Sequence, residues 1–238
     1  MVQWCSDVSY VEDLKGRCLT APHVRPLNRL IVELRAVHPD RFIPYIAPTF
    51  GGTNARVLAL FPTPGPGTFP DTGGSGMLCI ENDDAMSARH KAFLSEYKID
   101  VCDVVTWNAY PWFGSQWFED KSVRTKQNEI AARRALSRFL SLLPNLEVVM
   151  LHGTVARKAW EKLAEYTPVD LFFAPKVEPG AIHTSRLPAI GTWHTSPAVV
   201  DPKHRTPEEI VRFTRELHEA FAEAAAILRK PRPDEVPF

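Results

Sequence analysis

Four short runs of apolar and β-branched residues constrain the fold of this chain more than any other feature. The runs span residues 55–61, 101–107, 146–152 and 188–193. Runs of this length, bounded by turn-forming residues, are typical of buried strands. Because helical patterns separate them, we expect the strands to lie parallel, with helices on both faces of the sheet. The sequence therefore predicts a three-layer α/β/α sandwich with a central four-stranded, mainly parallel sheet.

The expected helices have apolar residues at helical spacing. They span about residues 25–37, 85–97, 127–142, 154–165 and 207–228. The last opens with Thr206 and Pro207, a capping residue followed by a proline in the first turn. In a sheet of this kind the ligand site lies at the carboxyl ends of the strands.

Length and charge set the limits of the domain and of its partners. The chain has 238 residues, and its 28 Lys and Arg balance 28 Asp and Glu. This length favours one domain over residues 1–238, with a core at about 26–228 and a flexible C-terminal tail at 229–238. A net charge of zero excludes a global positive field, so nucleic-acid binding would depend on local basic patches.

The hydropathy of the chain and the spacing of its cysteines bear on location and cofactors. No apolar stretch approaches the roughly 20 residues that cross a bilayer, and the first residues lack a basic start and an apolar signal core. We therefore expect a cytoplasmic protein with no membrane partner. The cysteines at 5, 18, 79 and 102 form no C-x-x-C pair, so we expect buried or half-buried free thiols and no metal site.

A proline- and glycine-rich turn follows the first predicted strand. It runs from Phe61 to Gly67, and its three prolines cannot continue a strand or a helix. Gly65 and Gly67 would let the backbone approach a ligand closely. A plain connector is the alternative; a phosphate-binding loop is disfavoured because no Gly-Lys-Ser/Thr ending follows.

Polar residues also follow the other predicted strands. Asn108 stands near two tryptophans, and its amide can offer both a donor and an acceptor to a planar base; capping a turn before Pro111 is the alternative. His194 precedes Thr-Ser-Pro at the end of the fourth strand. The acidic segment Glu81–Asp84 stands before a helix, where Asp83 or Asp84 would most simply act as a cap.

Taken in order, these strand ends resemble the uracil-DNA glycosylase superfamily over about residues 26–228. The first motif corresponds to Phe61-Pro-Thr-Pro-Gly-Pro66, the base-reading asparagine to Asn108, and the last motif to His194-Thr-Ser-Pro197. The resemblance implies an enzyme that flips uracil out of DNA and hydrolyses its glycosidic bond without a cofactor. The cysteine pattern does not match the relatives that carry an iron–sulfur cluster.

The resemblance also implies roles for individual residues. His194 would donate to the leaving uracil as a neutral group, and Asn108 would read the polar edge of the base. DNA contacts would come from two turns and a basic segment, comprising Pro64, Gly65, Pro66, Thr195, Ser196, Pro197, Lys203 and Arg205.

Two departures from the superfamily pattern affect the predicted site. The water-positioning residue of the first motif is usually Asp, Asn or Glu, whereas Pro62 and Thr63 stand here. Thr63 can hold a water but cannot act as a base near neutral pH. A carboxylate from the following segment would replace it, from Asp71, Glu81, Asp83 or Asp84, with the group Asn82-Asp83-Asp84 favoured; Asn82 would also contact uracil.

The second departure is the aromatic residue on which uracil stacks. Met77 and Ile80 are the nearest candidates in the sequence, and Met77 could stack through its sulfur. Trp107, Tyr110 or Trp112 are the alternatives.

The sequence thus predicts a monomeric, monofunctional glycosylase that removes uracil from DNA and begins base excision repair. One alternative is a member of the superfamily that acts on another deaminated base, such as hypoxanthine. The other is a damage-binding module that has lost catalysis, which the threonine at position 63 favours.

Overall fold

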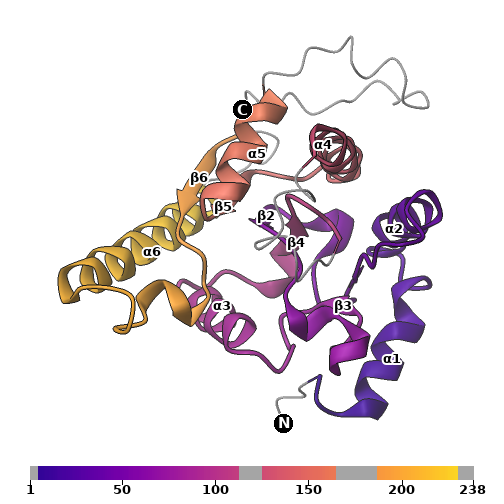
Figure 1. Cartoon of the computed structure of the whole chain (residues 1–238), viewed down its shortest axis with the longest axis horizontal. Coiled ribbons are helices and arrows are strands. Elements are labelled where there is room, and N and C mark those ends of the chain that lie inside the picture. The colour runs from indigo at the N-terminus through magenta and orange to yellow at the C-terminus, as the bar shows by residue number, and fades with distance from the viewer. Residues whose placement is uncertain (1–4, 113–124, 165–186, 230–238) are drawn as a thin grey trace, which may run out of the picture.

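The computed structural model describes residues 5–112, 125–164 and 187–229. Its central sheet has four parallel strands in the order β4-β2-β5-β6. The strands are β2 (Val57–Phe61), β4 (Val104–Asn108), β5 (Val148–His152) and β6 (Ala189–Thr192). Each strand falls within or beside one of the four predicted runs, and the mixed α/β fold is confirmed (Figure 1).

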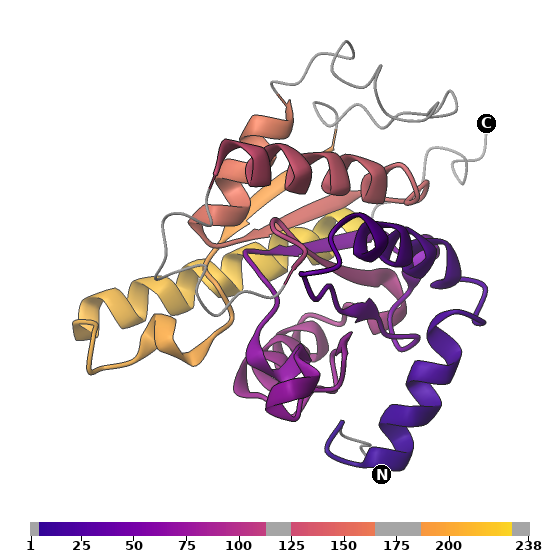
Figure 2. The ribbon, with the colours of Figure 1, turned by 45° about the vertical axis from the view of Figure 1, so that its right-hand side comes forward.

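Helices cover both faces of this sheet. Helices α3 (Ala85–Glu96) and α6 (Pro207–Leu228) lie on one side, and α4 (Lys126–Leu140) and α5 (Thr154–Ala164) lie on the other, with α2 (Arg25–Val37) beside α4 (Figures 1 and 2). On the first side Phe93 of α3 stacks on Phe221 of α6, with ring centroids 4.8 Å apart. On the second, Trp107 of β4 stacks on Phe139 of α4 at 4.2 Å. The layers are those of an α/β/α sandwich.

Strand alternation decides which side chains meet each helix layer. All residues of β2, β4 and β5 are buried, as expected for parallel strands covered on both faces. Thr106 and Asn108 of β4 point to the face opposite that of Trp107. Asn108 pairs in register with Phe61 at the end of β2, so the two side chains arrive together at the carboxyl edge.

The strand order places a crevice at that edge. The chain passes from β2 outward to β4 and then crosses back to β5 on the other side of β2. Connections that leave neighbouring strands in opposite directions open a crevice at their carboxyl ends. Here the change of direction lies between β2 and β5, whose last residues are Phe61 and His152.

A smaller unit beside the main sheet was not predicted from the sequence. It comprises α1 (Val8–Cys18) and a two-stranded parallel sheet of β1 (Tyr45–Ile46) and β3 (Met77–Leu78). Asn28 of α2 joins its parts: the side-chain amide donates to the carbonyls of Cys18 and Ile46 at 2.8 and 2.9 Å and accepts from the Ile46 N–H at 2.7 Å. Two-residue strands carry too little periodicity to be recognised in a sequence.

Helix α6 is the last element of the described residues. Helix α6 begins with the predicted Thr206 cap, which forms a full capping box with Glu209. It ends at Leu228, with Arg229 as its C-cap, and the rest of the predicted tail lies outside the described residues. Among the helices of the described ranges, none has the length and apolar character needed to cross a membrane.

Candidate functional site

A cavity of about 340 Å³ opens at the carboxyl ends of β2 and β4, beside the first turns of α3. A pocket of this size is in the range that binds small organic ligands. Its lining comes from five segments that are distant in sequence: Phe50; Phe61, Thr63, Pro64, Gly65, Pro66, Gly67 and Thr68; Leu78, Cys79, Ile80, Asn82, Asp84, Met86, Ser87 and His90; Thr106 and Asn108; and His194 and Ser196. Nine of the residues predicted for the site are among them.

The turn after β2 is held rigidly at the rim of the cavity. Ser75 N–H donates to the Gly67 carbonyl at 3.0 Å, and Gly76 N–H donates to the Thr68 carbonyl at 3.1 Å. A Cβ atom on Gly74 would lie 2.7 Å from the Gly67 carbonyl carbon. A side chain at position 74 would therefore force apart the two loop segments that these hydrogen bonds join. The turn is therefore a fixed wall and not a loose connector.

The structure distinguishes between the two predicted carboxylates. Asp84 lines the cavity and caps α3, accepting from the Ser87 N–H at 2.8 Å and the Ser87 hydroxyl at 3.0 Å. Its Oδ2 would lie 2.9 Å from a Cβ atom on Gly67, so the carboxylate abuts the turn of the first motif. Asp83 is exposed and lies outside the cavity lining. The helix-cap interpretation is confirmed for Asp84, and its carboxylate lines the same cavity as Thr63.

Asn82 lines the cavity but has its own partners. The side chain is buried, its oxygen accepts from the Ser75 hydroxyl at 2.6 Å, and its nitrogen donates to the Met77 carbonyl at 3.1 Å. These bonds join β3 to the segment that leads into α3. Asn82 therefore positions Asp84, with one N–H left for a ligand.

Asn108 differs from Asn82 because its side-chain nitrogen has no partner among the described residues. The residue is 2% exposed, and its Nδ2 has no hydrogen-bond partner among the described residues. The hydroxyl of Thr106, two residues earlier on the same face, is also unpaired and buried. A buried polar group without a partner costs roughly 1–3 kcal/mol, so the cavity would gain free energy from a ligand that pairs with this amide.

His194 presents a neutral donor at the cavity. Its Nδ1 accepts from the Ser196 N–H at 3.0 Å. An imidazole that accepts at Nδ1 carries its proton on Nε2 when neutral, so the hydrogen bond assigns this tautomer. Burial lowers the pKa of His194 to about 4, although the negative charge of Asp84 acts to raise it. At neutral pH the side chain is therefore an uncharged Nε2–H donor.

Two more histidines lie close to His194. The sequence places His152 at the end of the third predicted strand but assigns it no role, and sequence reasoning missed His90. His152 stacks on Phe61 with ring centroids 4.3 Å apart, and His90 of α3 lines the cavity and contacts the same Phe61 ring at 5.4 Å. Burial lowers the pKa of His90 to about 3 and that of His152 well below its ordinary value. The available signal was the helical spacing of His90 and Phe93, which puts both on the buried face of α3.

Several predicted contacts are not brought to the cavity. Met77 packs in a separate cluster behind it, with its sulfur 3.5 Å from that of Cys18. Trp107 points to the other face of the sheet, because it alternates with Asn108. Thr195 is fully buried and so cannot contact a DNA backbone. The aromatic rings that do line the cavity are those of Phe50 and Phe61.

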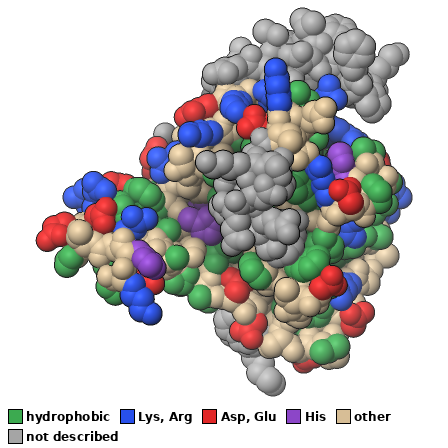
Figure 3. Space-filling model, viewed as in Figure 1, with side chains coloured by type: hydrophobic (Ala, Val, Ile, Leu, Met, Phe, Trp, Pro, Cys, Tyr) green, Lys and Arg blue, Asp and Glu red, His purple; other side chains and the backbone are tan. Residues whose placement is uncertain are grey.

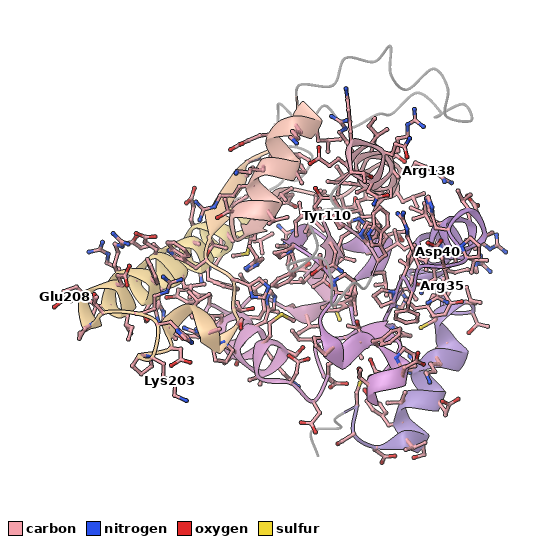
Figure 4. The ribbon with its side chains drawn as sticks, viewed as in Figure 1. Arg35, Asp40, Tyr110, Arg138, Lys203 and Glu208 are labelled. Carbon is pink, nitrogen blue, oxygen red and sulfur yellow. The ribbon has the colours of Figure 1, made fainter. Side chains whose placement is uncertain are left out.

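The predicted phosphate contacts lie on a lobe formed by the start of α6 and the segment before it. Lys203 points away from the body of the molecule there, on the same lobe as Glu208 (Figure 4). Arg205 is exposed and lies over the Phe213 ring at 5.4 Å. Figure 3 shows acidic and basic side chains intermixed on this lobe, at the left of the view. Pro197 is exposed at the start of the short helix Pro197–Val200.

Comparison with models of known protein families gives no match, and no curated protein is significantly similar to this chain. Within the described ranges, no three His, Cys, Asp or Glu side chains gather in an arrangement that could hold a metal ion. The chemistry of the cavity therefore has to be argued from its own residues.

The buried histidines predict that acid destabilises the fold. Each is neutral when folded and has a pKa of about 6.5 when unfolded, so below that pH the unfolded state binds more protons. Each should then lower the free energy of unfolding by about 1.4 kcal/mol per pH unit as the pH falls toward its folded pKa, which is about 4 for His194 and about 3 for His90. Urea denaturation between about pH 7.5 and pH 4.5 measures this slope.

Matched variants identify the source of the slope. His90→Phe should flatten it by about 1.4 kcal/mol per pH unit, whereas His204→Phe, at an exposed position, should leave it unchanged. Equal slopes in the two variants would contradict the assignment.

Proposed function

We propose that this protein is a DNA glycosylase that removes uracil from DNA. The observation that carries the proposal is the unpaired buried Nδ2 of Asn108 in the same cavity as the neutral Nε2–H donor of His194. A planar base with a carbonyl and an adjacent N–H would satisfy both. The proposal includes a monomeric, cytoplasmic enzyme that begins base excision repair without a cofactor.

Base selection would depend on Asn108. Its amide oxygen would accept from uracil N3–H while its Nδ2 donates to O4. Cytosine presents the opposite pattern on this edge, so it would leave buried groups unpaired, and discrimination by several orders of magnitude follows. Phe50 and Phe61 supply apolar aromatic surface for the ring of the base.

Bond cleavage would depend on His194. As the glycosidic bond breaks, its electron pair moves to the base, and negative charge grows on the uracil carbonyl oxygen. A preorganised neutral donor in a water-poor cavity stabilises that charge and loses no proton of its own. The sugar, left as an oxocarbenium ion, is then captured by water at C1′, and a proton is released.

Asp84 is the group best situated to orient that water. It lies against the Gly67 turn beside Thr63, where the resemblance leads us to expect a carboxylate or amide. Ser87 engages one lone pair on each carboxylate oxygen, which leaves further lone pairs for a water molecule. The turn Pro64-Gly-Pro66 and the pair Ser196-Pro197 would contact the backbone of the flipped nucleotide, with Lys203 and Arg205 near phosphates.

Hypoxanthine is the second candidate base. Its six-membered ring presents the same N–H and carbonyl edge as uracil, so the amide of Asn108 would read both.

The first test is single-turnover cleavage of labelled oligonucleotides that contain one uracil or one hypoxanthine, followed by alkali. We expect strand scission at uracil in single-stranded, U·G or U·A contexts. His194→Ala should reduce the rate by about 10²- to 10³-fold, because it removes the donor to the leaving group, with little change in binding. His204→Ala is the exposed control.

The outcomes separate the candidates. Scission at hypoxanthine alone would support the second base. Retention of the uracil strand without scission would identify a binding module, and an unchanged rate in His194→Ala would refute the leaving-group role.

Asn108→Asp tests the reading of the base with little change in shape. The carboxylate cannot donate to uracil O4 but can accept from the cytosine amino group, so the preference for uracil over cytosine should fall at least about 10²-fold. Asn145→Asp makes the same change at an exposed site and should preserve the preference. The measurement is the ratio of single-turnover rates on the two bases, and an undiminished ratio in Asn108→Asp would rule out this contact.

The two neighbouring aspartates allow a paired test of the water-orienting role. Asp84→Asn keeps a good helix cap but removes the charge, and it should slow cleavage by about 10²-fold. Asp83→Asn should leave the rate unchanged, since Asp83 lies outside the cavity. Equal rates in the two variants would show that the water is oriented by another group.

A further inference from the structure

Two cysteines that are distant in sequence meet behind one wall of the cavity. The sulfur atoms of Cys5 and Cys79 lie 3.6 Å apart, and the residues are 74 positions apart in the chain. Cys79 follows β3 and lines the cavity between Leu78 and Ile80. The backbone holds the pair together, because the Cys5 N–H donates to the Glu81 carbonyl at 2.9 Å.

The surroundings of Cys79 favour its thiolate. The Glu81 N–H donates to its sulfur at 3.4 Å, and the Thr49 hydroxyl lies 3.6 Å away. The hydrogen bond from Cys5 lowers the pKa of Cys79 most, and the Glu81 N–H and the Thr49 hydroxyl lower it further, whereas burial and the charge of the Glu81 carboxylate raise it. The same bond is the largest cause that raises the pKa of Cys5. Cys79 is therefore the nucleophile of the pair, since the thiolate is the reactive form.

The other two cysteines lack this arrangement. Cys18 is buried next to the sulfur of Met77, and burial is the main cause that raises its pKa to about 12. Cys102 is exposed, and desolvation and the charge of Asp100 raise its pKa. Neither has a neighbouring thiol among the described cysteines at hydrogen-bond distance, so the chain carries its own internal controls.

We propose that Cys79 is an oxidation site for hydrogen peroxide and that Cys5 is its resolving thiol. The Cys79 thiolate attacks one peroxide oxygen, the O–O bond breaks, and a sulfenic acid and hydroxide form. The Cys5 sulfur then attacks the sulfenic sulfur, which forms the S–S bond and releases water. In total the two thiols lose two electrons and two protons, and one peroxide is reduced to two waters.

The disulfide would act directly on the cavity wall. An S–S bond is about 2.05 Å long, so the sulfurs must approach from their separation of 3.6 Å. Cys79 is followed by Ile80, Asn82 and Asp84, which all line the cavity. Oxidation therefore ties the segment before α1 to the wall that carries Asp84. The inference goes beyond the proposed function and does not depend on it.

The test maps the thiols of the full chain after oxidation. The reduced protein is treated with hydrogen peroxide, and its intact mass is measured. It is then alkylated in denaturant so that the buried Cys18 can react, digested without reductant and analysed by mass spectrometry. We expect the intact mass to fall by two hydrogen atoms, a peptide pair joined through Cys5 and Cys79, and full alkylation of Cys18 and Cys102. Equal alkylation of all four cysteines, or a cross-link through Cys102, would overturn the proposal.

Single variants test the order of the steps. Cys5→Ser should accumulate a sulfenic acid at Cys79 that dimedone traps, while Cys79→Ser should give neither sulfenic acid nor disulfide. Cys102→Ser is the matched control and should form the disulfide at the unaltered rate. Trapping at Cys5 in the Cys79→Ser variant would reverse the assigned roles and contradict the proposal. Because no step uses DNA, these results are independent of whether the protein cleaves uracil.

Discussion

The covering of a parallel sheet on both faces is the constraint on which the rest of this structure depends. Strands β2, β4 and β5 are buried along their whole length, so polar side chains gain access to a ligand only where the strands end. The reversal of strand order beyond Phe61 opens that edge. Asn108, at the end of β4, and His194, two residues after β6, line one cavity although these two strands lie at opposite edges of the sheet.

Burial of imidazole rings sets the electrostatic character of this edge. His90, His152 and His194 surround the ring of Phe61, and burial is the largest cause that lowers the pKa of each. Neutral rings suit a site where charge must develop on the ligand and not on the protein. The same burial lowers the free energy of unfolding at acid pH, because the histidines bind protons more readily in the unfolded chain. Stability and the proposed chemistry thus depend on one cluster.

Asp84 illustrates how one side chain serves both the fold and the site. Its carboxylate caps the N-terminus of α3 by accepting a hydrogen bond from the Ser87 N–H, and it lies against Gly67 at the cavity rim. The resemblance to uracil-DNA glycosylases predicts a polar residue within the first turn, where Thr63 stands. The Asp84 carboxylate from the following segment lines the same cavity as Thr63, and the bonds from Ser75 and Gly76 fold the intervening loop back on itself.

The sequence by itself determined the alternation of strands and helices, the capping of α6 by Thr206 and the positions of Asn108 and His194 at strand ends, because local periodicity and capping chemistry encode them. It also indicated the group Asn82-Asp83-Asp84, but it could not choose among the three. Only the tertiary structure decided that Asp84 and His90 line the cavity and that Met77 and Trp107 do not. It also decided that Cys5 lies against Cys79 in the cavity wall. Those outcomes depend on strand order, side-chain alternation and contacts between residues far apart in the chain, such as Cys5 with Cys79 and His90 with Phe221, and no local pattern records such contacts.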